Sequence, residues 1–119
     1  MVTAGGEEMD ISFNQVNKTT VVALSGWLDA AAAPELKQAL AQCLDQASQL
    51  VIDFSQVAFI DSTGLGTLIS FLKNVEKAGK EMRIACLQGK PLRLFEMTRA
   101  YKIFAIHKTV DLAIKSFSP

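Results

Sequence analysis

A strand-to-helix signal runs through residues 50–66, which read LVIDFSQVAFIDSTGLG. The apolar run from Leu50 to Phe54 predicts a buried strand. A short polar turn is expected at Ser55-Gln56, before the apolar path resumes at Phe59-Ile60. Asp61-Ser62 then stand where a helix begins, because aspartate, serine and threonine are the usual residues at helix N-termini. The stretch therefore predicts a strand that leads directly into a helix.

The two longest helices are predicted from apolar residues at helical spacing. The first begins near Pro34, which suits a first helical turn because the N–H that proline lacks is unpaired there. Its single apolar face consists of Leu36, Ala39, Leu40, Cys43, Leu44 and Ala47. The second runs from Asp61-Ser62 to about Ala78 and ends at Gly79, a natural left-handed stop. Its buried stripe consists of Leu65, Leu68, Ile69, Leu72 and Val75.

The N-terminal third predicts an antiparallel hairpin. After a loose Gly5-Gly6 start, Met9 to Asn14 alternates apolar and polar residues, which is typical of an edge strand. Residues 16–19 form the expected turn, and Val21 to Leu24 form a strand that is buried on both faces. Gly26 is expected to break that strand.

The C-terminal third continues the alternation of strands and helices. The expected elements are a strand with Met82 and Ile84, a short helix from Pro91 that buries Leu92 and Phe95 and has Met97 as a further candidate, a strand over Ile103 to Ile106, and a helix capped by Thr109 with the stripe Val110, Ala113, Ile114 and Phe117. Such alternation favours right-handed crossovers and parallel strands. We expect an α/β fold with one domain over residues 1–119, a mixed, mostly parallel sheet and about four helices.

Composition argues against several functional classes. The chain has 119 residues, half of them apolar, with 12 lysines and arginines against 12 aspartates and glutamates. No basic field draws it to nucleic acid or to an acidic membrane surface. Its apolar runs are too short to span a bilayer, and Met1 to Asp10 lacks the basic start of a signal peptide. We expect a cytoplasmic protein in which Cys43 and Cys86 are reduced core residues rather than a disulfide.

The segment Asp61 to Gly66 combines three oxygen-bearing side chains with two glycines at the start of a helix. A helix N-terminus carries unpaired N–H groups and a partial positive charge, so it tolerates a phosphate on Ser62 or Thr63. The alternative is that these side chains only cap the helix. The glycines argue against capping alone, because each weakens the helix by up to about 1 kcal/mol compared with alanine. Their uncovered backbone would let a partner enzyme approach the hydroxyl.

The chain resembles STAS domains of the anti-sigma-factor antagonist group over nearly its whole length. The matching stretches are VALSGWLD at 22–29, LVIDFS at 50–55 and FIDSTGLG at 59–66. In that family, the serine directly after the aspartate of the last stretch is phosphorylated by a partner that is both anti-sigma factor and serine kinase. The resemblance implies that Ser62 is the phospho-acceptor. Trp27 departs from the family pattern, where a charged residue is common, and is either an interface anchor or a cover for the core edge.

The same resemblance implies a partner-switching cycle. Unphosphorylated protein binds the anti-sigma factor and frees its target, phosphorylated protein lets go, and a PP2C-type phosphatase restores it. The kinase supplies ATP and magnesium, so this chain needs no cofactor. We expect a monomer or weak dimer. Beside Ser62, the residues expected at the partner surface are Asp29, Asp53, Asp61, Thr63, Gly64, Leu65 and Gly66.

Other classes of function fit the residues less well. Ser62 lacks a base and an orienting group, since the only histidine is His107, so we expect no enzyme and no catalytic residue. One histidine and two separated cysteines do not make a metal site. Ile69 stands where a dinucleotide fingerprint would need its third glycine. The serious rival is a STAS subunit of a scaffold or lipid-transport complex, which would bind partners regardless of Ser62 phosphorylation.

Overall fold

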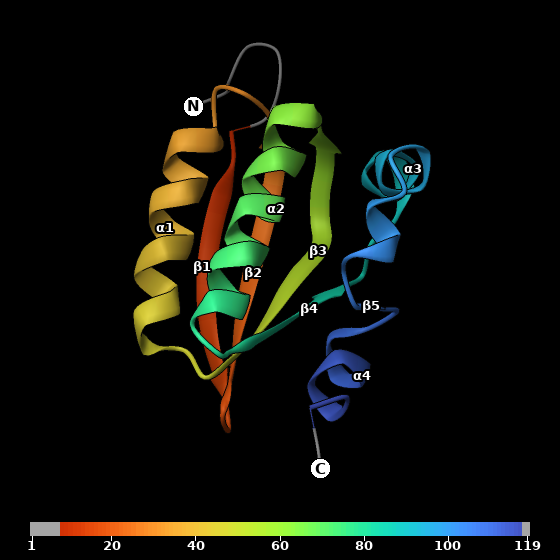
Figure 1. Cartoon of the computed structure of the whole chain (residues 1–119). Coiled ribbons are helices and arrows are strands. Elements are labelled where there is room, and N and C mark those ends of the chain that lie inside the picture. Colours follow the sequence, from red (N-terminus) through yellow and green to blue (C-terminus); the bar gives the residue numbers. More distant parts are fainter. Residues whose placement is uncertain (1–7, 118–119) are drawn as a thin grey trace.

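The computed structural model describes residues 8–117, and one mixed sheet runs through it (Figure 1). The strands of this sheet are β1 (Asp10–Val16), β2 (Thr19–Leu28), β3 (Gln49–Ile60), β4 (Glu81–Ala85) and β5 (Ile106–His107). They lie in the sheet in the same order as in the chain. β1 and β2 are antiparallel and the other neighbours are parallel. The predicted hairpin and the mostly parallel sheet are therefore confirmed.

Helices cover both faces of the sheet. The helical segments are α1 (Ala33–Gln46), α2 (Ser62–Lys77), α3 (Gly89–Met97), the short 3-10 helix η1 (Ala100–Lys102) and α4 (Val110–Lys115). Figure 1 shows α1 and α2 side by side across one face. α3 packs on β3, and α4 packs against β3, β4 and β5. In residues 8–117 no helix combines the length and the apolar character needed to cross a membrane.

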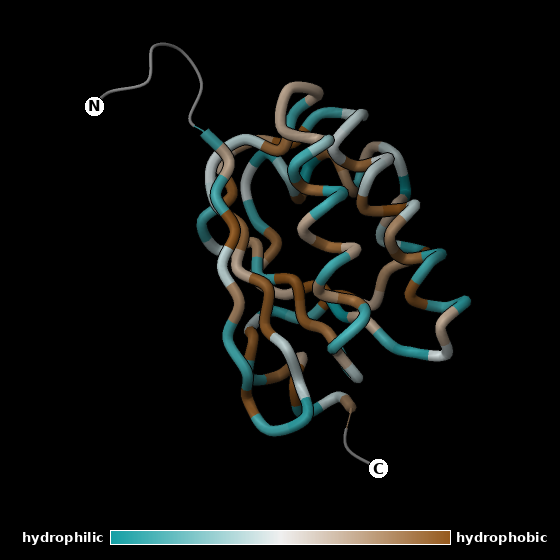
Figure 2. Tube along the Cα trace, turned by 90° about the vertical axis from the view of Figure 1, so that its left-hand side faces the viewer, coloured by the Kyte–Doolittle hydropathy of each residue, from teal (hydrophilic) through white to brown (hydrophobic). Residues whose placement is uncertain are grey.

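Alternate strand residues point to opposite faces, and this divides the buried side chains into two clusters. Val22 and Ile52 belong to the main core under α1 and α2, whereas Val21 and Val51 belong to a smaller cluster that contains Ala113 of α4. Figure 2 shows hydrophobic segments of the chain interspersed with hydrophilic ones. The long helices therefore carry most of the core, and α4 closes only part of the second face.

Arg83 attaches α4 to the sheet. Its Nε donates a hydrogen bond to Ser116 Oγ over 2.9 Å, and its guanidinium lies 4.4 Å from the centre of the Phe117 ring. A cation stacked on an aromatic ring is favoured by the quadrupole of the ring. Thr109 caps the helix as predicted, since its Oγ1 accepts a hydrogen bond from Leu112 N over 3.0 Å.

Two expected interruptions in the strands were wrong. β3 runs through Ser55-Gln56, where the register against β2 shifts by one residue, so this polar pair belongs to a bulge and not to a turn. Gly26 lies inside β2 with φ of 82°, and the register also shifts beside it. A Cβ at Gly26 would overlap the carbonyl oxygen of Glu8. The missing side chain of Gly26 therefore leaves space for the backbone of Glu8, and β2 continues through this glycine.

The C-terminal expectations need two further corrections. Met97 is 76% exposed and so does not belong to the core, and Ile103, expected in the last strand, lies in a turn and is 51% exposed. Arg99 adopts a left-handed conformation with φ of 60°, and η1 follows it. This turn places Phe104 in the core and shortens the last strand to Ile106–His107. The predicted short helix is confirmed, although it begins at Gly89 and not at Pro91. Phe95 is fully buried as expected, whereas Leu92 is only half-buried.

The start of α2 approaches the end of β2 at backbone distance. Gly64 is buried, and a Cβ there would overlap the carbonyl oxygen of Leu28. Gly66 lies in the same helix with nothing within 4 Å of the site of its absent Cβ. Close packing thus requires the first glycine and not the second.

The two glycines of α2 should respond oppositely to alanine. We expect Gly64→Ala to destabilise the fold by about 1–3 kcal/mol, because the added carbon has no space. We expect Gly66→Ala to stabilise it by about 0.5–1 kcal/mol, because alanine is the better helix former. Urea unfolding followed by circular dichroism measures both values. Equal stability of the two variants would contradict the close approach at Gly64.

Candidate functional site

Asp61 stands between the end of β3 and the start of α2 and caps the helix. Its backbone is extended, with φ of −107°, and its Oδ1 accepts a hydrogen bond from Gly64 N over 2.8 Å. This is the N-cap geometry that satisfies an otherwise unpaired helical N–H. Of the polar side chains in this segment, that of Asp61 therefore does the capping.

The second oxygen of Asp61 reaches a different part of the chain. Its Oδ2 accepts a hydrogen bond from Ala30 N over 3.1 Å, in the loop between β2 and α1. The backbone N–H of Asp61 donates to the carbonyl oxygen of Leu28 over 3.3 Å. One carboxylate thus holds the β2–α1 loop against the first turn of α2.

Asp29 organises the same loop from within. Its Oδ1 accepts a hydrogen bond from Ala32 N over 3.0 Å, just before α1 begins. Asp29 ends the β2 path, and Asp61 follows β3, its parallel neighbour. Asp29 and Asp61, both expected at the partner surface, therefore lie together at the carboxyl ends of two neighbouring parallel strands.

Ser62 is the first residue of α2 and is exposed to solvent. Because Asp61 provides the cap, Ser62 has no capping task, and its side chain lies at the positive end of a 16-residue helix. Thr63 is exposed beside it, whereas Leu65 is buried in the core. A hydroxyl is thus presented at a helix start that the rest of the loop holds in place.

A groove of about 400 Å³ lies between α1 and α2, and Thr63, the residue next to Ser62, lines it. Its lining residues come from the exposed faces of the two helices and include Lys37, Ala41, Thr63, Gly66, Thr67 and Ser70. Gly66 leaves its part of the groove without a side chain. The sequence predicted an uncovered backbone at both glycines, which is confirmed for Gly66 and wrong for Gly64, because Gly64 is buried against the Leu28 carbonyl. The residues that α1 contributes to the groove could not be predicted from this pattern.

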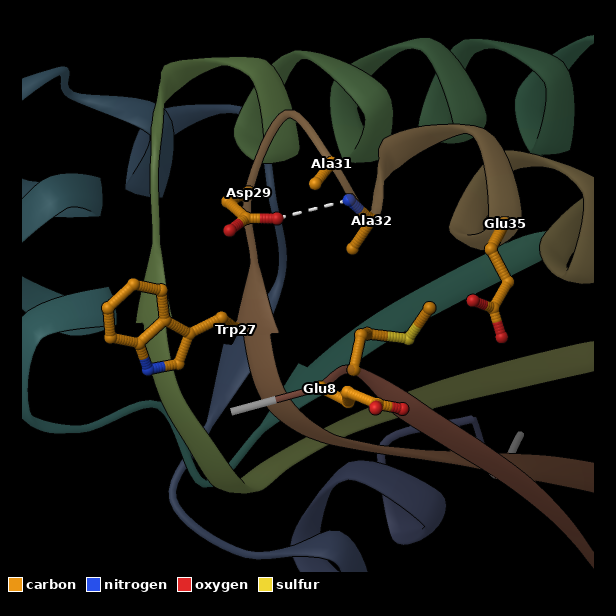
Figure 3. Close-up of a pocket in the computed structure, with 7 residues that line it drawn as sticks. Glu8, Trp27, Asp29, Ala31, Ala32 and Glu35 are labelled. Atoms are coloured by element: carbon orange, nitrogen blue, oxygen red, sulfur yellow. Dashed lines mark hydrogen bonds between the residues drawn. The ribbon is translucent and has the colours of Figure 1, made fainter. Parts of the chain in front are cut away.

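A second hollow of about 310 Å³ lies on the other side of the β2–α1 loop (Figure 3). Three acidic residues line it, namely Glu8, Asp29 and Glu35. Trp27 and Glu35 lie on opposite sides of the hollow in Figure 3. The Trp27 ring packs on Phe59 with their centroids 4.8 Å apart, and both side chains stay half-buried. Trp27 therefore covers Phe59 and presents an aromatic surface to this acidic hollow.

Asp53 does not belong to this cluster. It lies in the middle of β3, paired with Ala23 and with Ala85, where β4 ends. Asp61 lies eight residues further along the extended chain, which is roughly 26 Å at the usual rise of a strand. Asp53 was expected at the partner surface together with Asp29, but it lies away from this end of the sheet, because β3 continues well past the end of β4.

Both cysteines are free and half-buried. Burial raises the pKa of the Cys86 thiol, and the neighbouring Asp53 carboxylate raises it further. Burial also raises the pKa of Cys43, against the smaller opposing effect of Lys80. Neither thiol has the lowered pKa that marks a reactive cysteine. In the described chain, no three His, Cys, Asp or Glu side chains gather in a way that could hold a metal ion.

Comparison with known proteins agrees with the geometry. The model of the STAS domain family matches residues 10–113. An anti-sigma-B factor antagonist of Bacillus subtilis is 28% identical over 108 residues, which is 91% of this chain and 94% of the relative. One from Staphylococcus aureus is 31% identical over 87% of this chain and 97% of the relative.

A solved structure shows the same relationship. The crystal structure of an anti-sigma factor antagonist from Mycobacterium paratuberculosis superimposes with a TM-score of 0.84 at 27% identity, and the match covers 92% of this chain and 93% of the other. The family model matches almost all of the described residues, and the matched part includes all five strands and the Asp61–Gly66 loop. This chain belongs to the STAS domain family.

Proposed function

We propose that this protein is an anti-sigma-factor antagonist whose partner binding is switched by phosphorylation of Ser62. The observation that carries the proposal is the exposed hydroxyl at the first position of α2, next to a capping aspartate. The similarity to anti-sigma-B factor antagonists over most of both chains supports the class of partner. In the unphosphorylated form, the protein binds an anti-sigma factor that is also a serine kinase, and the target is released.

The added charge predicts whether phosphorylation strengthens or weakens partner binding. Phosphoserine adds about 1.5 to 2 negative charges at neutral pH, beside the carboxylates of Asp61 and Asp29. The start of α2 stabilises a nearby anion by typically about 0.3–1 kcal/mol. Burying the phosphate against a partner without a matching cation costs several kcal/mol, which exceeds the stabilisation that the helix start provides. Phosphorylation therefore leaves the fold intact and opposes the fitted complex.

The proposed partner surface centres on Ser62 and uses the regions beside it. The groove between α1 and α2 offers Thr63 and the bare backbone of Gly66 on one side. The acidic hollow with Asp29 lies across the loop. Asp61, Gly64 and Leu65 act from beneath this surface, because their side chains or backbone atoms hold the loop and the helix start. Asp53 lies outside it.

The remaining parts of the cycle follow from this assignment. The chain acts by binding and not by catalysis, with ATP and magnesium held by the kinase. A PP2C-type phosphatase removes the phosphate, which an exposed serine allows. The cycle takes place in the cytoplasm. A scaffold or transport subunit with the same fold would instead keep its partners whether or not Ser62 is modified.

Ser62 variants test the switch directly. We expect Ser62→Ala to bind the anti-sigma factor about as tightly as the unmodified protein. Ser62→Asp should bind at least about tenfold more weakly, which corresponds to about 1.4 kcal/mol. Isothermal titration calorimetry measures both affinities, with Thr63→Asp as a matched control that adds the same charge one residue away. If both Ser62 variants bind equally well, the phosphorylation switch is wrong and the constitutive scaffold is favoured.

The groove can be tested without changing charge at Ser62. We expect Gly66→Gln to weaken partner binding by about tenfold or more. The long side chain would fill the part of the groove that an anchoring side chain of the partner occupies in the proposed complex. Lys77→Gln is the control, since it places the same side chain on the last turn of α2. Unfolding curves of both variants establish that the fold is kept. Unchanged affinity of Gly66→Gln would remove the groove from the proposed surface.

A further inference from the structure

The outer edge of β1 has no neighbouring strand among the described residues, because β1 lies at the end of the sheet order. Figure 1 shows this strand at the margin of the sheet, behind α1. Four consecutive residues of the strand, Ser12 to Gln15, are all exposed, and Phe13 is 50% exposed. A strand edge of this kind offers unpaired backbone groups to another strand.

The hairpin register shows which backbone groups face outward. A two-residue turn joins Val16 to Thr19, its partner across the ladder. Such closing residues form a hydrogen-bonded pair, and hydrogen-bonded pairs alternate along an antiparallel ladder. The N–H and C=O groups of Ile11, Phe13 and Gln15 therefore point away from β2. In agreement, Ile11 N donates to the side chain of Asp10 over 2.9 Å and not to β2.

This edge lacks the features that usually prevent pairing. Residues 11–16 read ISFNQV and contain no charged residue and no proline. The register between β1 and β2 also runs without a shift from Asp10 to Val16, so no bulge bends the strand away. Natural edges are normally protected by lysine, proline or bulges. The free edge of β1 is thus seven residues long, free of bulges and uncharged from Ile11 to Val16.

We propose that β1 pairs antiparallel with β1 of a second copy of this chain, about a twofold axis at Phe13. This register pairs all seven residues, so that Asp10 lies opposite Val16 and Ile11 opposite Gln15 of the other copy. Phe13 then meets its own symmetry mate as a hydrogen-bonded pair. Centring on any other residue leaves part of the strand unpaired. The two five-stranded sheets become one continuous sheet.

Charge supports the same register. Just beyond the paired residues, exposed Glu8 comes opposite exposed Lys18 of the other copy, and the symmetry repeats this pair. No two like charges face one another across the strands. Exposed ion pairs contribute little affinity, so these pairs favour one alignment over others and do not hold the dimer by themselves.

A groove beside β1 supplies apolar contact. It measures about 400 Å³ and is lined by Phe13 and by residues of α1 that include Ala39, Gln42 and Cys43. In the twofold arrangement, the grooves of the two copies adjoin across the axis and the two Phe13 rings lie side by side. Pairing therefore removes from water an aromatic side chain that the monomer leaves half exposed.

Sedimentation velocity over a range of concentrations tests the pairing. The wild-type chain should shift from 12.9 kDa toward twice that mass as concentration rises. Phe13→Pro should stay monomeric, because proline removes an outward N–H and no hydrogen bond to β2. Phe13→Lys should do the same by placing two like charges on the axis. Ile103→Lys is the control, since Ile103 is equally exposed elsewhere, and it should still dimerise.

A cysteine on the axis tests the register. Phe13→Cys in a Cys43→Ser background should form an intermolecular disulfide on mild oxidation, because Cα atoms of a hydrogen-bonded pair are about 5.5 Å apart. The background change is needed because Cys43 lines the same groove. Ile103→Cys in that background should form none. Lys18→Glu and Glu8→Lys should each weaken the dimer, and their combination should restore it.

The outcomes separate this proposal from the phosphorylation switch. Ser62→Asp should dimerise as the wild type does, because Ser62 lies at the start of α2 and outside β1. A wild-type chain that stays monomeric at all concentrations overturns the β1 pairing and leaves the switch untouched. A dimer that survives both Phe13 variants also overturns it, since association would then use another surface.

Discussion

The carboxylate of Asp61 is the contact on which the arrangement of the site depends. One oxygen caps α2 through Gly64 N and the other holds Ala30 N in the β2–α1 loop. The same turn sits directly on the Leu28 carbonyl, where only glycine leaves enough space. Two segments about thirty residues apart in the chain are therefore joined at one point. Ser62 follows immediately, and its exposure is a consequence of this anchoring.

Because of this anchoring, the residues that stabilise the loop differ from the residues that form the proposed switch surface. Asp61, Gly64 and Leu65 face inward and hold the loop, while Ser62, Thr63 and Gly66 face outward. A phosphate added to an outward hydroxyl meets the favourable end of a helix and disturbs no buried contact. The fold can thus stay constant while the surface changes its charge. The two surfaces proposed for this protein, the α2 start and the β1 edge, can for this reason act independently.

Part of the fold and of the site could be predicted because the relevant signals are local. Helical spacing of apolar residues gave both long helices to within one residue, and Thr109 was recognisable as a cap. Asp61 and Ser62 could be placed at a helix start for the same reason, since capping involves residues three apart. The C-terminal strand was misplaced because the left-handed turn at Arg99 contains no glycine, the residue by which such a turn is usually recognised in a sequence.

The features that could not be predicted from the sequence depend on contacts between residues that lie far apart in the chain. Alternation and capping are properties of neighbouring residues, so the amino-acid sequence was sufficient for the α/β class, the hairpin and the serine that follows an aspartate at a helix start. The different roles of Gly64 and Gly66, the bond from Asp61 to Ala30 and the isolation of Asp53 emerged only in three dimensions. They depend on strand length and register, which packing across the whole sheet decides and no short pattern encodes.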